Sequence, residues 1–270
     1  MTWTPHPSRR FVRPFGMLAA LAVASATRAD DRQFTFLDMA KVTTPGQFEF
    51  EQWIDWEHRT PDAHNSNVFI LKEELEIGVN DKLMFGVDIP EWHFQTSPED
   101  QKQGPRFDTV GGEFRYRFLN PTKDFIGLAM KGEIELGPRV RGASVRGIVQ
   151  KNFDRFTLLY NLTLESEWSR GEDDDNAGER VSDGELSQAL GGSIEFTPNW
   201  FAGAELVHEI PMPDWHTGHQ QNVFLGPNLS YHASFVNGRN WALTGTALFR
   251  VTDSDEEPSF RFRMIFEFDF

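Results

Sequence analysis

Charged side chains recur at every second position in several short segments of this 270-residue chain. In a β-strand this spacing places them all on one face. Opposite charges on such a face can pair and support a wall, whereas a continuous series can guide ions or polar solutes past it. The residues in this pattern are Glu49, Glu51, Asp55, Glu74, Glu76, Arg115, Arg117, Lys131, Glu133, Glu135, Arg261 and Arg263.

The positions between these charges are mostly apolar, which predicts strands with one apolar and one charged face. Most of the expected strands are long enough to cross a bilayer at a tilt, which takes about 9–11 residues. Glu73 falls on an apolar face, so we expect an irregularity there. The predicted strands are 46–58, 67–79, 82–93, 107–118, 125–137, 144–151, 156–168, 185–196, 200–210, 221–232, 241–251 and 259–270.

The connections between these segments alternate in length. Short turns such as 80–81 and 197–199 carry Asn, Asp or Pro, and the intervening connections, such as 94–106 and 169–184, are longer and polar. Asn, Asp and Pro favour tight turns. The alternation predicts an all-β, antiparallel, transmembrane up-and-down barrel of about twelve strands, with both chain ends on one side.

Alternation alone does not say which face points outward, because a soluble barrel turns its apolar face inward. Aromatic residues near strand ends favour lipid outside, since aromatic side chains gather at the two membrane interfaces. The predicted interface aromatics are Trp56, Phe125, Phe156, Trp168, Trp200, Trp241 and Phe270. With lipid outside, the charged face lines the lumen. We then expect a basic strip of Arg115, Arg117, Arg261 and Arg263 opposite the acidic first and fifth strands.

The N-terminus has the pattern of an export signal. Arg9, Arg10 and Arg13 precede a short apolar run at 17–26, and small residues lead to a cleavage position after Ala29. The run is shorter than the roughly 20 residues of a membrane-spanning helix. We therefore predict a cleaved signal peptide at 1–29. Residues 30–45 would follow as a periplasmic lead that could enter the lumen or stay disordered, before a barrel at 46–270.

Composition narrows the classes of function. The net charge is −15, and a strongly acidic chain is a poor partner for nucleic acid because phosphates repel it. The chain contains no Cys, so disulfides do not hold it together.

Two weak signals of chemistry remain. His208, Glu209, Asp214, His216 and His219 surround one predicted outer loop, but their spacing matches no metal motif, so we expect no metal site.

His232 and Ser234 are residue types found in hydrolases, but no third group in a suitable context accompanies them. A nucleophilic Ser needs a base that is itself oriented by a third group, so we expect no enzymatic activity.

The terminal strand 259–270, which ends on Phe270, resembles the C-terminal signature of bacterial outer-membrane β-barrels. The whole mature chain resembles the broad group of small porin-like and transporter-like barrels, some families of which have no assigned function. This resemblance implies residence in the outer membrane of a Gram-negative bacterium, and contact with lipid and lipopolysaccharide. It also implies recognition of the C-terminal strand by the barrel-assembly machinery.

The resemblance further implies passive passage of an unidentified small solute or ions without a cofactor. The alternative is a closed structural or surface-binding barrel, which a lumen-narrowing N-terminal segment would favour. A soluble periplasmic protein is a third possibility.

Overall fold

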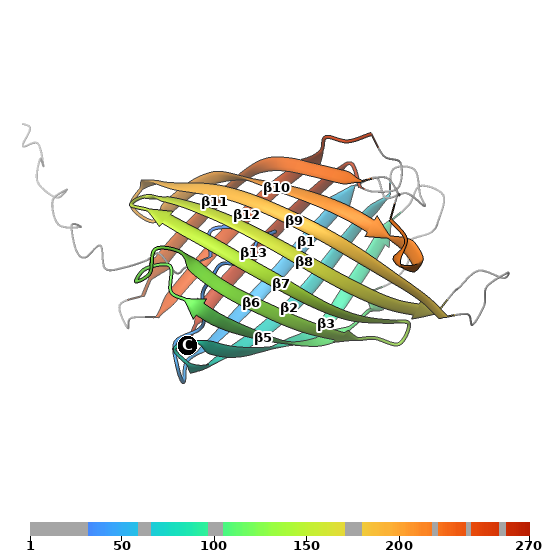
Figure 1. Ribbon diagram of the computed structural model, residues 1–270, viewed down its shortest axis with the longest axis horizontal. Helices are drawn as coiled ribbons and strands as arrows, with labels where there is room; N and C mark the ends of the chain where they lie inside the picture. The colour runs from blue at the N-terminus through green and yellow to red at the C-terminus, as the bar shows by residue number, and fades with distance from the viewer. Residues whose placement is uncertain are drawn as a thin grey trace, which may run out of the picture.

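The computed structural model describes residues 32–58, 66–96, 105–170, 180–217, 221–235, 239–253 and 258–270. These residues form one antiparallel sheet that closes into a barrel (Figure 1). The predicted signal peptide at 1–29 lies outside them. The strands are β1 (Phe48–His58), β2 (Asn67–Asn80), β3 (Leu83–Thr96), β4 (Arg106–Phe107), β5 (Val110–Leu119), β6 (Gly127–Leu136), β7 (Val140–Phe153), β8 (Phe156–Arg170), β9 (Arg180–Thr197), β10 (Trp200–Met212), β11 (Asn222–Ser234), β12 (Asn240–Arg250) and β13 (Phe260–Asp269).

The barrel closes because β13 pairs with β1. Along this seam Phe50 lies opposite Phe268, and the backbone N–H groups of Phe48 and Phe270 each donate to the other residue's carbonyl, at 3.2 and 2.9 Å. The other strands pair with their sequence neighbours, and the two-residue β4 only extends the edge of β3. The predicted fold class, an up-and-down antiparallel barrel of about twelve strands, is confirmed.

Two strands begin four or five residues earlier than their sequence patterns predict. Strand β7 begins at Val140 rather than 144, and β9 begins at Arg180 rather than 185. Their first residues include Gly142 and Gly184, so the apolar alternation that marks a strand is weak there. Backbone pairing with β6 and β8 still extends both strands.

The irregularity expected at Glu73 is present. The register between β2 and β3 shifts between Leu71 and Glu73, because Leu71 faces Trp92 whereas Glu73 faces Ile89. Pro90 lies in the skipped stretch of β3 and has no N–H to donate to a partner strand.

The apolar face of the sheet points outward. On β5, Phe114 is 38% exposed, whereas its neighbours Glu113 and Arg115 are 4% and 2% exposed. The same alternation continues around the barrel, where Val87 and Ile134 are more than half exposed. This arrangement is the reverse of a soluble barrel and matches an outer face in contact with lipid.

The inside of the barrel is occupied by the chain's own N-terminal portion. Residues 32–44, called the internal segment below, run through the lumen before the chain turns into β1. Phe34, Leu37, Met39 and Ala40 are buried and form a small apolar core with side chains from the wall. The lead predicted at 30–45 is thus described from Arg32 onward, and this part of it lies inside the barrel.

The described residues contain a single short helical turn, η1 (Pro213–Trp215), in the connection between β10 and β11. No helix in the described part of the chain has the length and apolar character needed to span a membrane.

Candidate functional site

The internal segment has no secondary structure of its own, so its backbone groups need partners on the barrel wall. Polar side chains of β7, β8 and β10 supply acceptors for its N–H groups. These contacts are Thr35 N and Phe36 N to the Glu205 carboxylate at 2.9 and 2.7 Å, Asp38 N to Asn161 Oδ1 at 2.7 Å, and Ala40 N to Gln150 Oε1 at 2.9 Å.

Strands β11 and β12 hold the carbonyl groups at the start of the segment. Ser230 and Thr244 each donate to the carbonyl of Arg32 at 3.0 Å, and His232 Nε2 lies 2.7 Å from the same oxygen. Asn228 donates to the carbonyl of Gln33 at 2.9 Å. The wall therefore binds the backbone of the segment from both sides.

Asp38 is the charged centre of the segment. It is 2% exposed and contacts Arg115 on β5 at 3.2 Å, Lys131 on β6 at 3.9 Å and Arg146 on β7. The sheet register places these three cations directly opposite one another on adjacent strands. Like charges in that position repel, so Asp38 relieves a strained part of the wall.

The surroundings of Asp38 keep it ionised. Burial opposes the charge, but Lys131, Arg146 and Arg115 together hold the pKa of this carboxyl well below its usual range. The two other charged side chains of the segment are also paired. Arg32 lies 2.7 Å from Glu51, and Lys41 lies 2.8 Å from Glu49 and 2.6 Å from Glu267.

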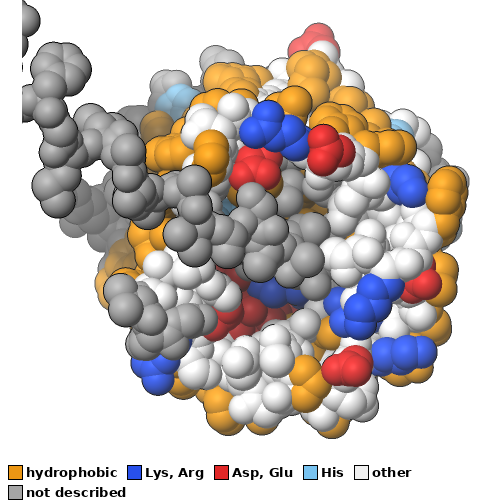
Figure 2. Space-filling view, turned by 90° about the vertical axis from the view of Figure 1, so that its left-hand side faces the viewer, with side chains coloured by type: hydrophobic (Ala, Val, Ile, Leu, Met, Phe, Trp, Pro, Cys, Tyr) orange, Lys and Arg blue, Asp and Glu red, His pale blue; other side chains and the backbone are white. Residues whose placement is uncertain are grey.

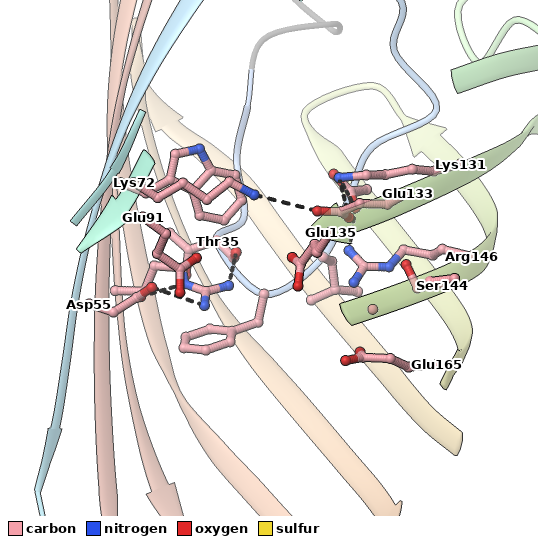
Figure 3. Close-up of a pocket in the computed structure, with 17 residues that line it drawn as sticks. Thr35, Asp55, Lys72, Glu91, Lys131, Glu133, Glu135, Ser144, Arg146 and Glu165 are labelled. Carbon is pink, nitrogen blue, oxygen red and sulfur yellow. Dashed lines mark hydrogen bonds and ion pairs between the residues drawn. The ribbon is translucent and has the colours of Figure 1, made fainter. Parts of the chain in front are cut away.

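A cavity of about 250 Å³ remains beside the internal segment. Figure 3 shows Lys72 reaching Glu133, and Asp55 bound to a guanidinium, which belongs to Arg263 at 2.5 Å. The lining residues are Thr35, Phe36, Leu37, Asp38, Trp53, Asp55, Lys72, Glu91, Lys131, Glu133, Glu135, Gly142, Ala143, Ser144, Arg146, Glu165 and Arg263.

The cavity wall carries carboxylates that lie near cations without a direct ion pair, since Lys72 attracts Glu135 and Arg146 attracts Glu165. Glu135 and Glu165 point into the space in Figure 3, and neither forms an ion pair with a described residue. Gly142, Ala143 and Ser144 supply little side-chain volume at this part of the wall. The remaining space is therefore polar and shaped by small residues.

One mouth of the barrel shows apolar side chains on the outside and charged side chains on the inside. In Figure 2, hydrophobic side chains surround the outside, and acidic and basic side chains lie recessed within the opening. This is the end of the barrel at which the C-terminus lies (Figure 1).

All twelve charged residues singled out from the sequence lie on the inner side of the wall. Eight are at most 9% exposed, namely Glu49, Glu51, Asp55, Glu74, Glu76, Arg115, Arg117 and Lys131, and the other four are partly buried, namely Glu133, Glu135, Arg261 and Arg263.

The expected basic strip is wrong. Strand β13 lies beside β1 rather than opposite it, so Arg263 pairs with Asp55, and Arg261 lies 3.5 Å from Glu57. Arg115 contacts Glu113 on its own strand, and Arg117 donates to the carbonyl of Asp81. Neighbouring strands bring opposite charges together, and this pairing distributes the arginines among carboxylates.

The predicted interface aromatics lie on the outer side of the barrel. Phe125 is 82% exposed, and Phe156, Trp168, Trp200 and Phe270 are 38–47% exposed. Trp56 and Trp241 are partly buried by neighbouring rings, as in the stacking of Trp56 on Phe69 at 6.0 Å. Their position at a membrane interface stays a prediction.

Trp53 is an internal residue that the sequence analysis missed. It shares the parity of Glu51 and Asp55, and its ring lies 5.1 Å from the guanidinium carbons of Arg32 and Arg263. The sequence signal that could have identified Trp53 is an aromatic residue on an otherwise acidic strand face. Asn161, Gln150 and Asn228, which bind the segment, gave a similar signal as polar residues within apolar strands.

The residues behind the two weak signals of chemistry, the loop histidines and acids and the pair His232 and Ser234, mostly bind other side chains of the barrel. His208 Nε2 is 2.9 Å from Gln221, and Glu209 binds Arg261, while His219 is outside the described residues. His232 lies 2.6 Å from Ser230 and contacts the internal segment, and Ser234 donates to Asn240 at 2.7 Å.

An apolar outer face, a charged inner face and a closed antiparallel wall define a transmembrane β-barrel of the outer-membrane type. The chain belongs to the family described as "Family of unknown function (DUF6662)", whose profile matches residues 26–259.

The fold is similar to that of the COG4313 outer membrane channel from Pseudomonas putida F1. The two chains are 12% identical with a TM-score of 0.57, and the match covers 85% of this chain and 97% of that chain. The NanC porin is 7% identical with a TM-score of 0.49, over 82% of this chain and 98% of that one. A comparison with curated proteins gives no significant match.

Proposed function

We propose that the protein is an outer-membrane channel for small hydrophilic solutes or ions, which its internal segment keeps closed. The observation that carries the proposal is the position of residues 32–44 inside the barrel, with all three of their charged side chains paired to the wall. The similar fold of the outer membrane channel from Pseudomonas putida also supports this proposal. Export through a cleaved signal at 1–29 would deliver the chain to that membrane.

The contacts of the segment suit displacement as a unit. They are hydrogen bonds, ion pairs and apolar contacts to side chains, so the wall keeps its own backbone pairing when the segment leaves. Gly46 begins the connection to β1 with a φ of +77°, a conformation that glycine adopts easily. Displacement would expose a lumen lined by both signs of charge, which suits polar solutes.

The outer surface would contact lipid and lipopolysaccharide. The C-terminal strand, which ends on Phe270 and closes the seam with β1, would be the part recognised by the barrel-assembly machinery.

A tether between the segment and the wall tests the proposal directly. Because the chain has no Cys, Ala40→Cys and Gln150→Cys introduce the only two thiols, at positions joined by a hydrogen bond. A short bis-methanethiosulfonate linker would hold the segment in place. In planar bilayers we expect stepwise conductance from the untethered double variant, loss of those steps on cross-linking, and recovery after reduction.

Each single-Cys variant treated with the same reagent is the control, since it can be modified but not tethered. A variant lacking residues 30–44 should show longer and larger openings. Silence from that variant, with folding shown by heat-modifiable migration in gels, would contradict the channel and favour the closed structural barrel.

A further inference from the structure

Three carboxylates of the wall converge beneath the internal segment without full hydrogen bonding. Glu74 and Glu76 on β2 are each 1% exposed, and Glu113 on β5 is 4% exposed. Glu113 Oε2 is in an ion pair with Lys131, and Glu76 Oε1 lies 3.6 Å from Arg115, whereas the buried Glu74 Oε1 accepts no hydrogen bond and has no ion-pair partner among the described residues. Buried acceptors are nearly always paired, so the Glu74 oxygen beside two further carboxylates points to a missing partner.

The three groups are close enough to share one ligand. One carboxylate oxygen from each residue can be chosen so that all lie within 4.8 Å of one another. The register explains this, because Glu76, Gly86 and Glu113 lie directly opposite one another on β2, β3 and β5. A Cβ atom at Gly86 would come within 2.6 Å of Glu113 Cγ and 2.9 Å of Glu74 Oε1. Glycine at this position therefore leaves room for the carboxylates to meet.

Neighbouring cations satisfy two of the three residues in part. Arg115 lies 3.6 Å from Glu76 and 3.3 Å from Glu113, and Lys131 also pairs with Glu113. Glu74 differs from both, since its side chain forms no hydrogen bond or direct ion pair with a described residue, although Lys131 and Lys72 attract its charge from a greater distance. A fully buried carboxylate without a partner is strongly unfavourable unless a cation or a proton neutralises it.

A divalent cation would offset the surplus of acids in the surrounding ion-pair network. Among the described residues, the ion pairs of this network join four bases to five acids, and Glu74 adds a sixth acid, while Arg117 is a further buried base on the same face of β5. The bases are Lys72, Arg115, Lys131 and Arg146, and the acids in ion pairs are Asp38, Glu76, Asp88, Glu113 and Glu133.

We propose that Glu74, Glu76 and Glu113 bind one Ca²⁺ ion inside the barrel wall. Calcium takes oxygen ligands at about 2.3–2.6 Å, so ligands on opposite sides of the ion are about 4.6–5.2 Å apart. Three oxygens within 4.8 Å can therefore surround it. Thr43 of the internal segment donates to Glu76 at 3.0 Å, so the ion would also fix a residue that contacts the segment.

Equilibrium dialysis with radioactive Ca²⁺ tests the proposal without any measurement of conductance. The full chain, folded in detergent and stripped with EGTA, is compared with Glu74→Gln and with Glu57→Gln. Glu57 is a matched control because it is another inward-facing acid of the wall, paired with Arg261 and remote from the three carboxylates. We expect Glu74→Gln to bind one ion fewer per chain than the wild type, and Glu57→Gln to bind the same number.

The difference between variants removes any contribution from acidic surface loops, which all three proteins share. Equal stoichiometry in the wild type and Glu74→Gln would overturn the proposal. A folded wild type that binds no Ca²⁺ would also overturn it and would assign the carboxylates to a shared proton. If Glu74→Gln does not fold, Gly86→Ala is the second variant, and Ca²⁺ affinity equal to that of the wild type would overturn the proposal.

Discussion

Replacing Asp38 by Asn should release the internal segment from the wall. Arg115 would keep Glu113 at 3.3 Å and Glu76 at 3.6 Å, and Lys131 would keep Glu133 at 3.3 Å. Arg146 would keep no ion-pair partner among the described residues. The substitution therefore removes about one buried ion pair in net terms, and breaking such a pair costs about 3–5 kcal/mol.

The lower end of that range applies, because Asn preserves the shape of the side chain and Arg146 still donates to Thr163 at 2.9 Å. A loss of about 3 kcal/mol changes an equilibrium constant by about a hundredfold, since each 1.4 kcal/mol is a factor of ten. We expect the ratio of open to closed time of single channels in planar bilayers to rise by about that factor.

The matched control is Glu209→Gln. Glu209 pairs with Arg261 at 2.5 Å, and both residues belong to the wall, so this variant loses a buried pair without touching the segment. Its open probability should equal that of the wild type. If Asp38→Asn, shown to be folded, conducts no more than Glu209→Gln, the reasoning that assigns closure to Asp38 is refuted.

Three further substitutions should weaken either the contact between the internal segment and the wall or the seam between β1 and β13. Gly191→Val should displace Phe34 at a cost of about 1–3 kcal/mol, because a Cβ at position 191 would come within 2.7 Å of the Phe34 ring. Hydrogen exchange of residues 32–44 should then accelerate. Gly192→Val is the control, since its Cβ would meet only the Phe156 ring on the outer face, and it should leave exchange unchanged. Glu205→Ala removes the acceptor of two backbone N–H groups and should cost about 1–3 kcal/mol for each; unchanged exchange in the same assay would contradict this. Phe270→Ala removes a stacked ring pair at the seam worth about 1 kcal/mol and should lower the midpoint of unfolding in urea, with no shift counting against a role in closure.

The wall of the barrel could be predicted because alternation in each strand is a local property of the sequence. Phe114 between Glu113 and Arg115 is enough to assign both faces of β5. Prediction was weaker where Gly142 and Gly184 interrupt the pattern, since glycine has no side chain to mark a face. The backbone there is still paired by its neighbours, which sequence inspection does not detect.

The internal segment could not be derived in this way. It forms no strand or helix, so it has no period, and its partners lie far along the chain: Asp38 binds Asn161, and Arg32 binds Thr244. The basic strip failed for a related reason. Alternation assigns Arg263 to a face but does not reveal that Asp55 is its direct neighbour across the seam.

The contacts of Arg32 also bear on how the barrel assembles. Its side chain binds Glu51 on β1, and its carbonyl binds Ser230 on β11 and Thr244 on β12. Closing the seam between β1 and β13 joins the two most distant parts of the chain, which is the step with the largest loop-closure entropy. A segment that holds β1 close to β11 and β12 reduces the length of chain that must still be closed when β1 pairs with β13. The residues that we propose close the lumen should therefore also speed the last step of folding, and variants that loosen them should refold more slowly.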